Sequence, residues 1–284
     1  MAIPDDGSRE VRVPTLDVGG ATLDYEVTGA SGPLVVQLHG LTSSRGRDAQ
    51  IGLDLARALH RDARVLRYDA RGHGHSTGSP DPADYAWEHL AEDLLALLDH
   101  LAPDEKVHGI GTSMGCGTLL HAVLREPGRF ASLTLVVPPT AWETRRAQSR
   151  DYLVNADLVE REGIDAFVEL GLLSPTVPAL ADAPTTRPEV GERLLPTVLR
   201  GAAATDLPDP EALGRVRTPT LVLAWSDDPK HPLSTAALLH DVMPESRLVV
   251  ARTPYGVMAW PGLFADHVTA SDHATATTAV GESA

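Results

Sequence analysis

The chain has 284 residues, 43% of them hydrophobic and 22% charged, which is the composition of a globular domain with an ample core. A net charge of −15 argues against binding to nucleic acids or anionic membrane surfaces, and one cysteine, Cys116, excludes an internal disulfide and a thiolate metal site. There is no basic, apolar leader and no run of eighteen apolar residues, so we expect a cytoplasmic protein without a membrane span.

Short apolar runs alternate with amphipathic stretches along much of the chain. Residues 11–18 and 21–27 flank Gly19-Gly20 and predict a β-hairpin. Leucines at helical spacing predict a helix over residues 84–101, and a second helix is expected over residues 116–124. Further strands are predicted at residues 34–38, 64–68, 106–110, 132–137, 219–224 and 247–250. Strands that alternate with helices favour a parallel sheet covered on both faces.

This alternation stops between residues 138 and 217. The stretch has helix-like segments at 142–155, 164–172 and 189–203, no convincing strand, and a cluster of Pro and Ala residues over 174–188. We expect a helical cap over a site, inserted into a core formed by residues 1–137 and 218–268. The Ala-, Thr- and Ser-rich tail, residues 269–284, is expected to be disordered.

The run Gly111-Thr112-Ser113-Met114-Gly115 lies between a predicted strand and a predicted helix. A strand, the pattern G-x-S-x-G and a helix in that order predict a nucleophile elbow, with the serine hydroxyl held at the tip of a tight turn. Glycine is needed on each side because a Cβ there would strike neighbouring backbone. Ser113 is therefore the candidate nucleophile; the alternative is that it only occupies a turn.

Four motifs in this order resemble the α/β-hydrolase superfamily, in particular its capped branch of small esterases, enol-lactonases and cofactor-free haloperoxidases. They are His39-Gly40-Leu41, the D-x-R-G-x-G-x-S turn at residues 69–76, the elbow, and the acid loop at residues 225–232, and they cover most of residues 20–265. The resemblance implies a mostly parallel eight-stranded sheet flanked by helices, with a helical cap.

The resemblance also implies roles for single residues. Asp228 would orient and charge-balance a histidine; Asp227 competes for this role, but the spacing to Pro232 favours Asp228. Alternatively, Asp228 stabilises its own Pro-rich turn. The backbone N–H groups of Leu41 and Met114 would form an oxyanion hole.

Asp69 and Arg71 would tie loops together through buried polar contacts. Cys116 would pack as a small hydrophobic residue.

The catalytic histidine of the superfamily has no counterpart at its usual place. Family members typically carry Gly-His where this chain has Gly256-Val257, and valine cannot accept a proton. One interpretation is that His231, three residues past Asp228, substitutes as the base. A second is a reaction without a Ser–His pair, with Tyr255 as acid or hydrogen-bond donor. A third is a binding protein that has kept the fold.

From these observations we expect an enzyme that acts on a small organic ester or lactone through Ser113, with Asp228 and an atypical base such as His231. The alternatives are a cyclase, isomerase or lyase on the same scaffold, or a pseudoenzyme that binds small molecules. No cofactor or metal is expected, because the sequence has no phosphate-binding loop or metal-ligand cluster. The protein is expected to be a monomer or a homodimer.

Overall fold

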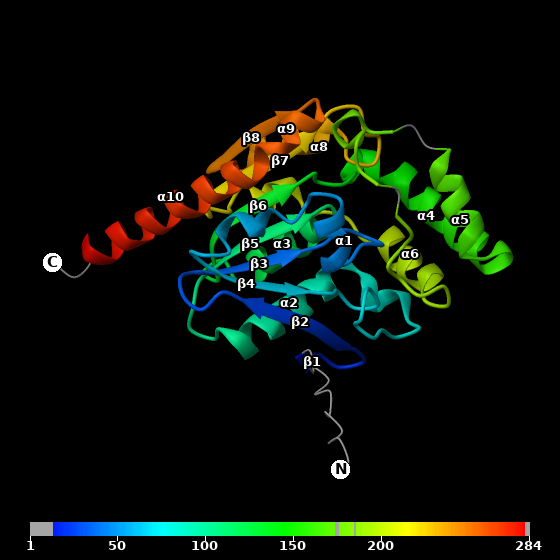
Figure 1. Cartoon of the computed structure of the whole chain (residues 1–284), viewed down its shortest axis with the longest axis horizontal. Coiled ribbons are helices and arrows are strands. Elements are labelled where there is room, and N and C mark those ends of the chain that lie inside the picture. Colours follow the sequence, from blue (N-terminus) through cyan, green and yellow to red (C-terminus); the bar gives the residue numbers. More distant parts are fainter. Residues whose placement is uncertain (1–13, 174–175, 185, 282–284) are drawn as a thin grey trace, which may run out of the picture.

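A computed structural model describes residues 14–173, 176–184 and 186–281, with side chains as far as residue 273 (Figure 1). Eight strands form one sheet in the order β1-β2-β4-β3-β5-β6-β7-β8. Strand β2 is antiparallel to β1 and β4, and all the other neighbours are parallel. The strands are β1 (Thr15–Asp17), β2 (Thr22–Thr28), β3 (Leu34–Leu38), β4 (Arg64–Tyr68), β5 (Val107–Thr112), β6 (Phe130–Val136), β7 (Thr220–Trp225) and β8 (Ser246–Ala251). The mostly parallel eight-stranded sheet predicted from the sequence is confirmed.

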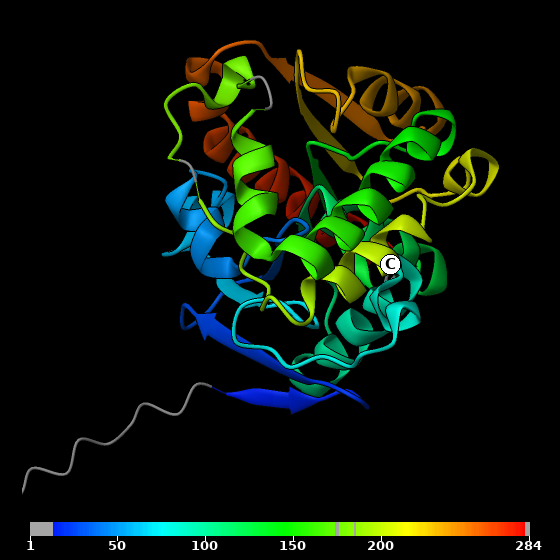
Figure 2. The ribbon, with the colours of Figure 1, turned by 90° about the vertical axis from the view of Figure 1, so that its right-hand side faces the viewer.

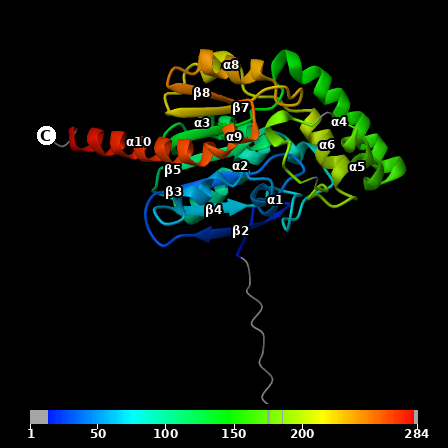
Figure 3. The same ribbon diagram turned by 45° about the horizontal axis from the view of Figure 1, so that its top comes forward.

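Helices cover both faces of the sheet (Figures 1 and 3). One buried cluster joins the sheet to α2 (Trp87–Leu101), α3 (Met114–Arg125), α7 (Pro210–Leu213) and α8 (Leu233–Val242). A second cluster joins the other face to the 3₁₀-helix η1 (Leu55–Leu59), α9 (Pro254–Met258) and α10 (Trp260–Gly281). Strands β3, β5 and β7 are buried at every position, which explains why their sequences lack the alternation of apolar and polar residues typical of a half-exposed strand.

Residues 138–217, hereafter the helical insertion, separate β6 from β7. In the part of this segment that the structure describes, the elements are α4 (Trp142–Glu162), α5 (Ile164–Leu172), η3 (Pro178–Leu180), α6 (Leu195–Ala203) and α7. Helices α4, α5 and α6 lie beyond the carboxyl ends of the strands and cross in front of the sheet in Figure 2. Tyr152, Ala156 and Val159 of α4 pack with Val198 and Leu199 of α6 in a third buried cluster.

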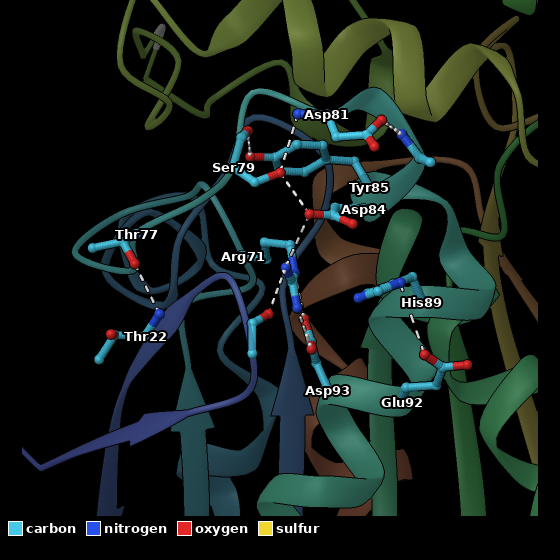
Figure 4. Close-up of polar contacts among 12 residues, drawn as sticks. Thr22, Arg71, Thr77, Ser79, Asp81, Asp84, Tyr85, His89, Glu92 and Asp93 are labelled. Carbon is cyan, nitrogen blue, oxygen red and sulfur yellow. Dashed lines mark hydrogen bonds and ion pairs between the residues drawn. The ribbon is translucent and has the colours of Figure 1, made fainter.

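The turn after β4 is held by a buried ion pair (Figure 4). The Arg71 guanidinium has no exposed surface and donates to both carboxylate oxygens of Asp93 on α2, at 2.9 and 2.7 Å. Asp69 accepts hydrogen bonds from the backbone N–H groups of Arg45 and His75, both at 3.0 Å. The structural role expected for Asp69 and Arg71 is thus confirmed. Another short contact in this region joins Ser79 Oγ to Asp84 on the 3₁₀-helix η2 (Pro82–Tyr85).

The structure differs from the expected disordered tail, because α10 continues to Gly281. Alanine is abundant over this stretch and favours helix. Asp272 Oδ1 also lies 2.9 Å from His108 Nε2 on β5, so the helix contacts the sheet beyond residue 269. Residues 282–284 lie outside the described residues, as do residues 11–13 of the predicted hairpin. No helix among the described residues has the length and apolar character to cross a membrane.

Candidate active site

Ser113 stands between β5 and α3, with backbone angles φ 51° and ψ −107°. The positive φ is a strained conformation for a residue with a Cβ, and the turn that imposes it presents the side chain at its tip. A Cβ on Gly111 would lie 2.3 Å from Gly115 O, and one on Gly115 would lie 2.8 Å from Leu38 O. Both glycines are therefore required by close backbone approach, as the sequence predicts.

Three side chains form a hydrogen-bonded chain that begins at Ser113. Ser113 Oγ lies 2.8 Å from His231 Nε2, and His231 Nδ1 lies 2.7 Å from Asp228 Oδ2. With the proton on Nδ1 donated to the carboxylate, Nε2 is left as an acceptor for the Ser113 hydroxyl. The structure thus brings together Ser113, Asp228 and His231, the three candidates singled out in the sequence.

Asp228 is 8% exposed, and both of its carboxylate oxygens accept hydrogen bonds. Its Oδ1 accepts from the backbone N–H of Lys230 at 2.8 Å, and its Oδ2 accepts from Trp225 Nε1 at 2.8 Å as well as from His231. Burial alone would raise the pKa of Asp228, but the hydrogen bond and charge of His231, together with these donors, lower the pKa to about 2. The carboxylate is therefore ionised at neutral pH and holds the imidazole in one orientation.

The acid loop after β7 turns back on itself within a few residues. Asp227 has φ 63°, and the His231 N–H donates to Asp228 O at 3.3 Å, so the histidine ring returns over the carboxylate. Asp227 is exposed and accepts from the hydroxyl of Ser226 instead. The His231 ring also packs edge-on against Trp225, with centroids 5.9 Å apart and planes at 84°.

Val257 lies on α9 after the last strand and is 8% exposed. Its side chain belongs to the apolar cluster that contains Trp225 and Trp260, whose rings stack with centroids 6.0 Å apart. Tyr255, on the same short helix, is 82% exposed and lines neither of the cavities that contain Ser113. The structure does not bring Tyr255 to the serine.

The backbone N–H groups of Leu41 and Met114 have no hydrogen-bond partner among the described residues. Met114 is the first residue of α3, and the first N–H groups of a helix have no partner within it. His39 sets the Leu41 loop in place, because its Nδ1 donates to Gly40 O at 2.8 Å and its Nε2 accepts from the Ala70 N–H at 2.9 Å. Burial lowers the pKa of His39, which keeps it neutral in this role.

Two cavities meet at Ser113 and His231. The larger, about 390 Å³, lies under the helical insertion and is lined in part by Gln148, Asp151, Tyr152 and Phe167. The smaller, about 180 Å³, is walled by Ile51, Leu53, Val137, Leu180 and Trp225, with Arg47 and Asp48. The chain thus offers room on two sides of the serine for the two parts of a small substrate.

Sequence reasoning missed some residues of this site. Trp225 stands where the superfamily pattern has glycine, and that departure was the only available signal for its hydrogen bond to Asp228. The lining residues of the insertion could not be chosen, because a helix that packs on one face and borders a cavity on the other shows no clean periodicity. Within residues 14–173, 176–184 and 186–273, no group of three or more His, Cys, Asp or Glu side chains is placed to hold a metal ion.

Cys116 is fully buried and its Sγ lies 3.0 Å from Gly111 O. Burial raises the pKa of the Cys116 thiol, so the thiol remains protonated, and the side chain packs in the interior at the start of α3.

Comparisons with known proteins agree with the fold. Residues 33–160 match the model of the alpha/beta hydrolase fold family. The protein named "Putative carbamate hydrolase RutD" of Pseudomonas savastanoi pv. phaseolicola is 32% identical over 230 residues, which cover 78% of this chain and 85% of that protein. The 3-oxoadipate enol-lactonase 1 of Acinetobacter baylyi is 30% identical over 223 residues, covering 74% of this chain and 77% of the relative.

Among solved structures, the enol-lactonase from Burkholderia xenovorans LB400 superposes with a TM-score of 0.74 at 22% identity. The match covers 90% of this chain and 100% of that structure, and at this identity it shows a shared fold. A hydrolase from Pseudomonas aeruginosa PA01 gives a TM-score of 0.70 at 27% identity, covering 92% of this chain and 98% of the other. The chain belongs to the alpha/beta hydrolase fold family.

Proposed function

We propose that this protein is a serine hydrolase that cleaves a small ester, lactone or carbamate, with Ser113 as nucleophile, His231 as base and Asp228 as the orienting acid. The observation that carries the proposal is the distance of 2.8 Å between Ser113 Oγ and His231 Nε2. A serine hydroxyl is a weak nucleophile at neutral pH, and a base within hydrogen-bond distance is what activates it.

In the proposed reaction, Ser113 Oγ attacks the substrate carbonyl while its proton passes to His231 Nε2. Asp228, ionised and bonded to Nδ1, stabilises the imidazolium that forms. The N–H groups of Leu41 and Met114 would donate to the developing oxyanion, an effect that removes about 3–4 kcal/mol of barrier per donor in other serine hydrolases. His231 then returns the proton to the leaving group, and a water molecule releases the acyl group by the same steps.

The substrate class rests on the size of the cavities and on the relatives. The two cavities have volumes of about 390 and 180 Å³, which suit a compact substrate rather than a polymer or a long acyl chain. The relatives are named for a carbamate and for an enol-lactone, both of which present a carbonyl that is cleaved by acyl transfer. We further propose that Val257 fills the position of the usual base, and that the enzyme is cytoplasmic and acts without a cofactor.

Hydrolysis of a panel of p-nitrophenyl and lactone substrates tests this proposal, with Ser113→Ala as the first variant. The proposal predicts that kcat/KM falls by about 10⁴-fold or more in Ser113→Ala, since the nucleophile is lost while the fold remains. Turnover that persists in Ser113→Ala, after contaminating esterases have been excluded, would favour a reaction that does not use the serine.

A further inference from the structure

The smaller cavity beside Ser113 has one feature that its apolar walls do not explain. Asp48, on the short helix α1 (Arg45–Gln50), contributes to the wall although it is 1% exposed. Its Oδ1 accepts a hydrogen bond from Ser43 Oγ at 2.8 Å. Its Oδ2 is buried and has no hydrogen-bond partner among the described residues.

An unpartnered buried carboxyl oxygen is unfavourable, and more so when the group is charged. The guanidinium of Arg47, the neighbouring cation, does not supply the missing hydrogen bond to Oδ2. Arg47 lines the same cavity, but its Nη1 donates to the backbone oxygens of Thr42 and Arg187, at 3.1 and 2.9 Å. Burial raises the pKa of Asp48 to about 7; its bond from Ser43 and the charge of Arg47 oppose this shift, whereas the nearby carboxylates of Asp54 and Asp69 add to it.

We propose that the substrate supplies the missing partner: the smaller cavity is a subsite for a compact group that carries one N–H or O–H donor, and Asp48 Oδ2 accepts its hydrogen bond. The inference deepens the proposed function and rests on it, because the same cavity is bordered by Ser113 and His231. A group bound there lies next to the carbonyl that Ser113 would attack.

Two properties of the subsite set its preference. Its volume of about 180 Å³ is below the range of roughly 300–1,000 Å³ typical of drug-sized ligands, so it accepts a short group only. A site built to hydrogen-bond a polar group rejects the analogue that lacks it, because the buried polar atom is then left without a partner. A hydroxyl, primary amide or ammonium group should therefore be preferred to a methyl group of the same size.

Matched substrates that exchange a methyl group for a hydroxyl test the inference on each side of the scissile bond. The acyl pair is p-nitrophenyl butanoate and p-nitrophenyl 3-hydroxypropanoate; the alcohol pair is propyl acetate and 2-hydroxyethyl acetate. In one of the pairs, we expect the wild-type protein to favour the hydroxylated member by about tenfold or more in kcat/KM, because the methyl member leaves the buried oxygen without a partner.

A variant without the carboxylate should lose that preference. Asp48→Leu keeps the volume of the side chain, removes the acceptor and should reverse the ratio toward the methyl compound. Asp99→Asn is the control, because Asp99 is paired with Arg129 at 3.3 Å, does not line the cavity and does not act on the pKa of Asp48; its ratio should equal that of the wild type. A wild-type preference for the methyl member in both pairs, or a ratio that Asp48→Leu leaves unchanged, overturns the inference.

Binding without turnover separates this inference from the proposed function. The affinities of 3-hydroxypropanamide and butanamide can be compared by ligand-observed NMR for the wild type, Asp48→Leu and Ser113→Ala. Preferential binding of the hydroxylated amide that is lost in Asp48→Leu supports the subsite, even if no ester is cleaved. Equal binding of the two amides to the wild-type protein, together with normal Ser113-dependent hydrolysis, would contradict the subsite and leave the proposed function standing.

Discussion

His231 reaches Ser113 from the acid loop itself, and its geometry depends on Trp225. The indole donates to the same oxygen of Asp228 that accepts from His231, and its ring packs edge-on against the imidazole. Trp225 also stacks on Trp260 in the cluster that contains Val257. A bulky residue at position 225 therefore occupies apolar space beside the site and fixes the carboxylate at the same time.

Trp225→Phe keeps the ring and removes the donor. We expect kcat to fall about tenfold with KM little changed, because a hydrogen bond to a charged group contributes roughly 1.5–3 kcal/mol and this one orients the acid rather than the substrate. Steady-state kinetics on the best ester of the panel measure the effect. Trp260→Phe is the matched control, since Trp260 Nε1 has no partner among the described residues; an equal loss of kcat in both variants would contradict the orienting role.

Asp48→Asn should stabilise the protein at alkaline pH. In the wild type, the folded-state pKa of about 7 lies above the ordinary value, so the stability contributed by the protonated carboxyl is lost as the pH rises from about 4 to about 7. The amide does not titrate, while Arg47, Asp54 and Asp69 are unchanged in the variant. We expect the variant's gain in free energy of unfolding to be roughly 1–4 kcal/mol larger at pH 8 than at pH 4, measured by urea denaturation. A pH-independent difference would contradict the raised pKa.

At the scale of elements, buried polar contacts hold in place the turn after β4, whose Ala70 N–H bonds to His39 beside the Leu41 loop. The turn after β4 is fastened to α2 by the pairing of Arg71 with Asp93, and Asp69 accepts from the N–H groups of Arg45, at the start of α1, and of His75, in its own turn. These contacts hold irregular backbone in one conformation, where no strand or helix ladder is available to do so. The loops can therefore support the site without belonging to a regular element.

Arg71→Met should destabilise the fold by about 3–5 kcal/mol, because it leaves the nearly buried Asp93 carboxylate without its partner. The double variant Arg71→Met/Asp93→Asn should be more stable than the sum of the two single changes predicts, since it removes the uncompensated charge. Urea denaturation of the four proteins gives the coupling energy. Strictly additive losses would mean that the pair contributes nothing beyond its separate side chains.

The sequence predicts the strands of this fold well because most are buried on both faces. Predicted strands 34–38 and 64–68 coincide with β3 and β4, and the elbow follows from two glycines whose Cβ positions are occupied by backbone. The tail could not be predicted: residues 269–281 have no apolar periodicity, and the contact of Asp272 with His108 depends on tertiary structure.

The candidate site was predictable in its residues but not in its geometry. The resemblance to the α/β-hydrolase superfamily indicates Ser113 and Asp228, and His231, three residues past Asp228, is one of the alternatives for the base. Whether that histidine can face the serine depends on the turn at Asp227, whose positive φ is not encoded by a glycine. The unpartnered oxygen of Asp48 is invisible in the sequence for a similar reason. Burial and the lack of a partner are properties of the packed loops, not of the residue type.

At the scale of the whole molecule, the sheet presents the elbow and the acid loop at its carboxyl edge, and the helical insertion lies over that edge (Figures 1 and 2). Residues of α4, α5 and α6 line the larger cavity together with Ser113 and His231. A substrate would therefore lie between two layers that are separate in sequence. This arrangement would let the insertion and the core both contact the substrate, while the core supplies the proposed chemistry.

The most direct test of the account is the rate at which a fluorophosphonate probe labels Ser113, followed by intact mass for the wild type, Ser113→Ala, His231→Ala and His240→Ala. His240 is exposed on α8 and bonds to Ser246, so its variant controls for the loss of a histidine as such. We predict rapid stoichiometric labelling of the wild type and of His240→Ala, no labelling of Ser113→Ala, and labelling slowed by at least about 10³-fold in His231→Ala. Equal labelling of the wild type and His231→Ala would show that His231 does not activate the serine, and would contradict the central claim.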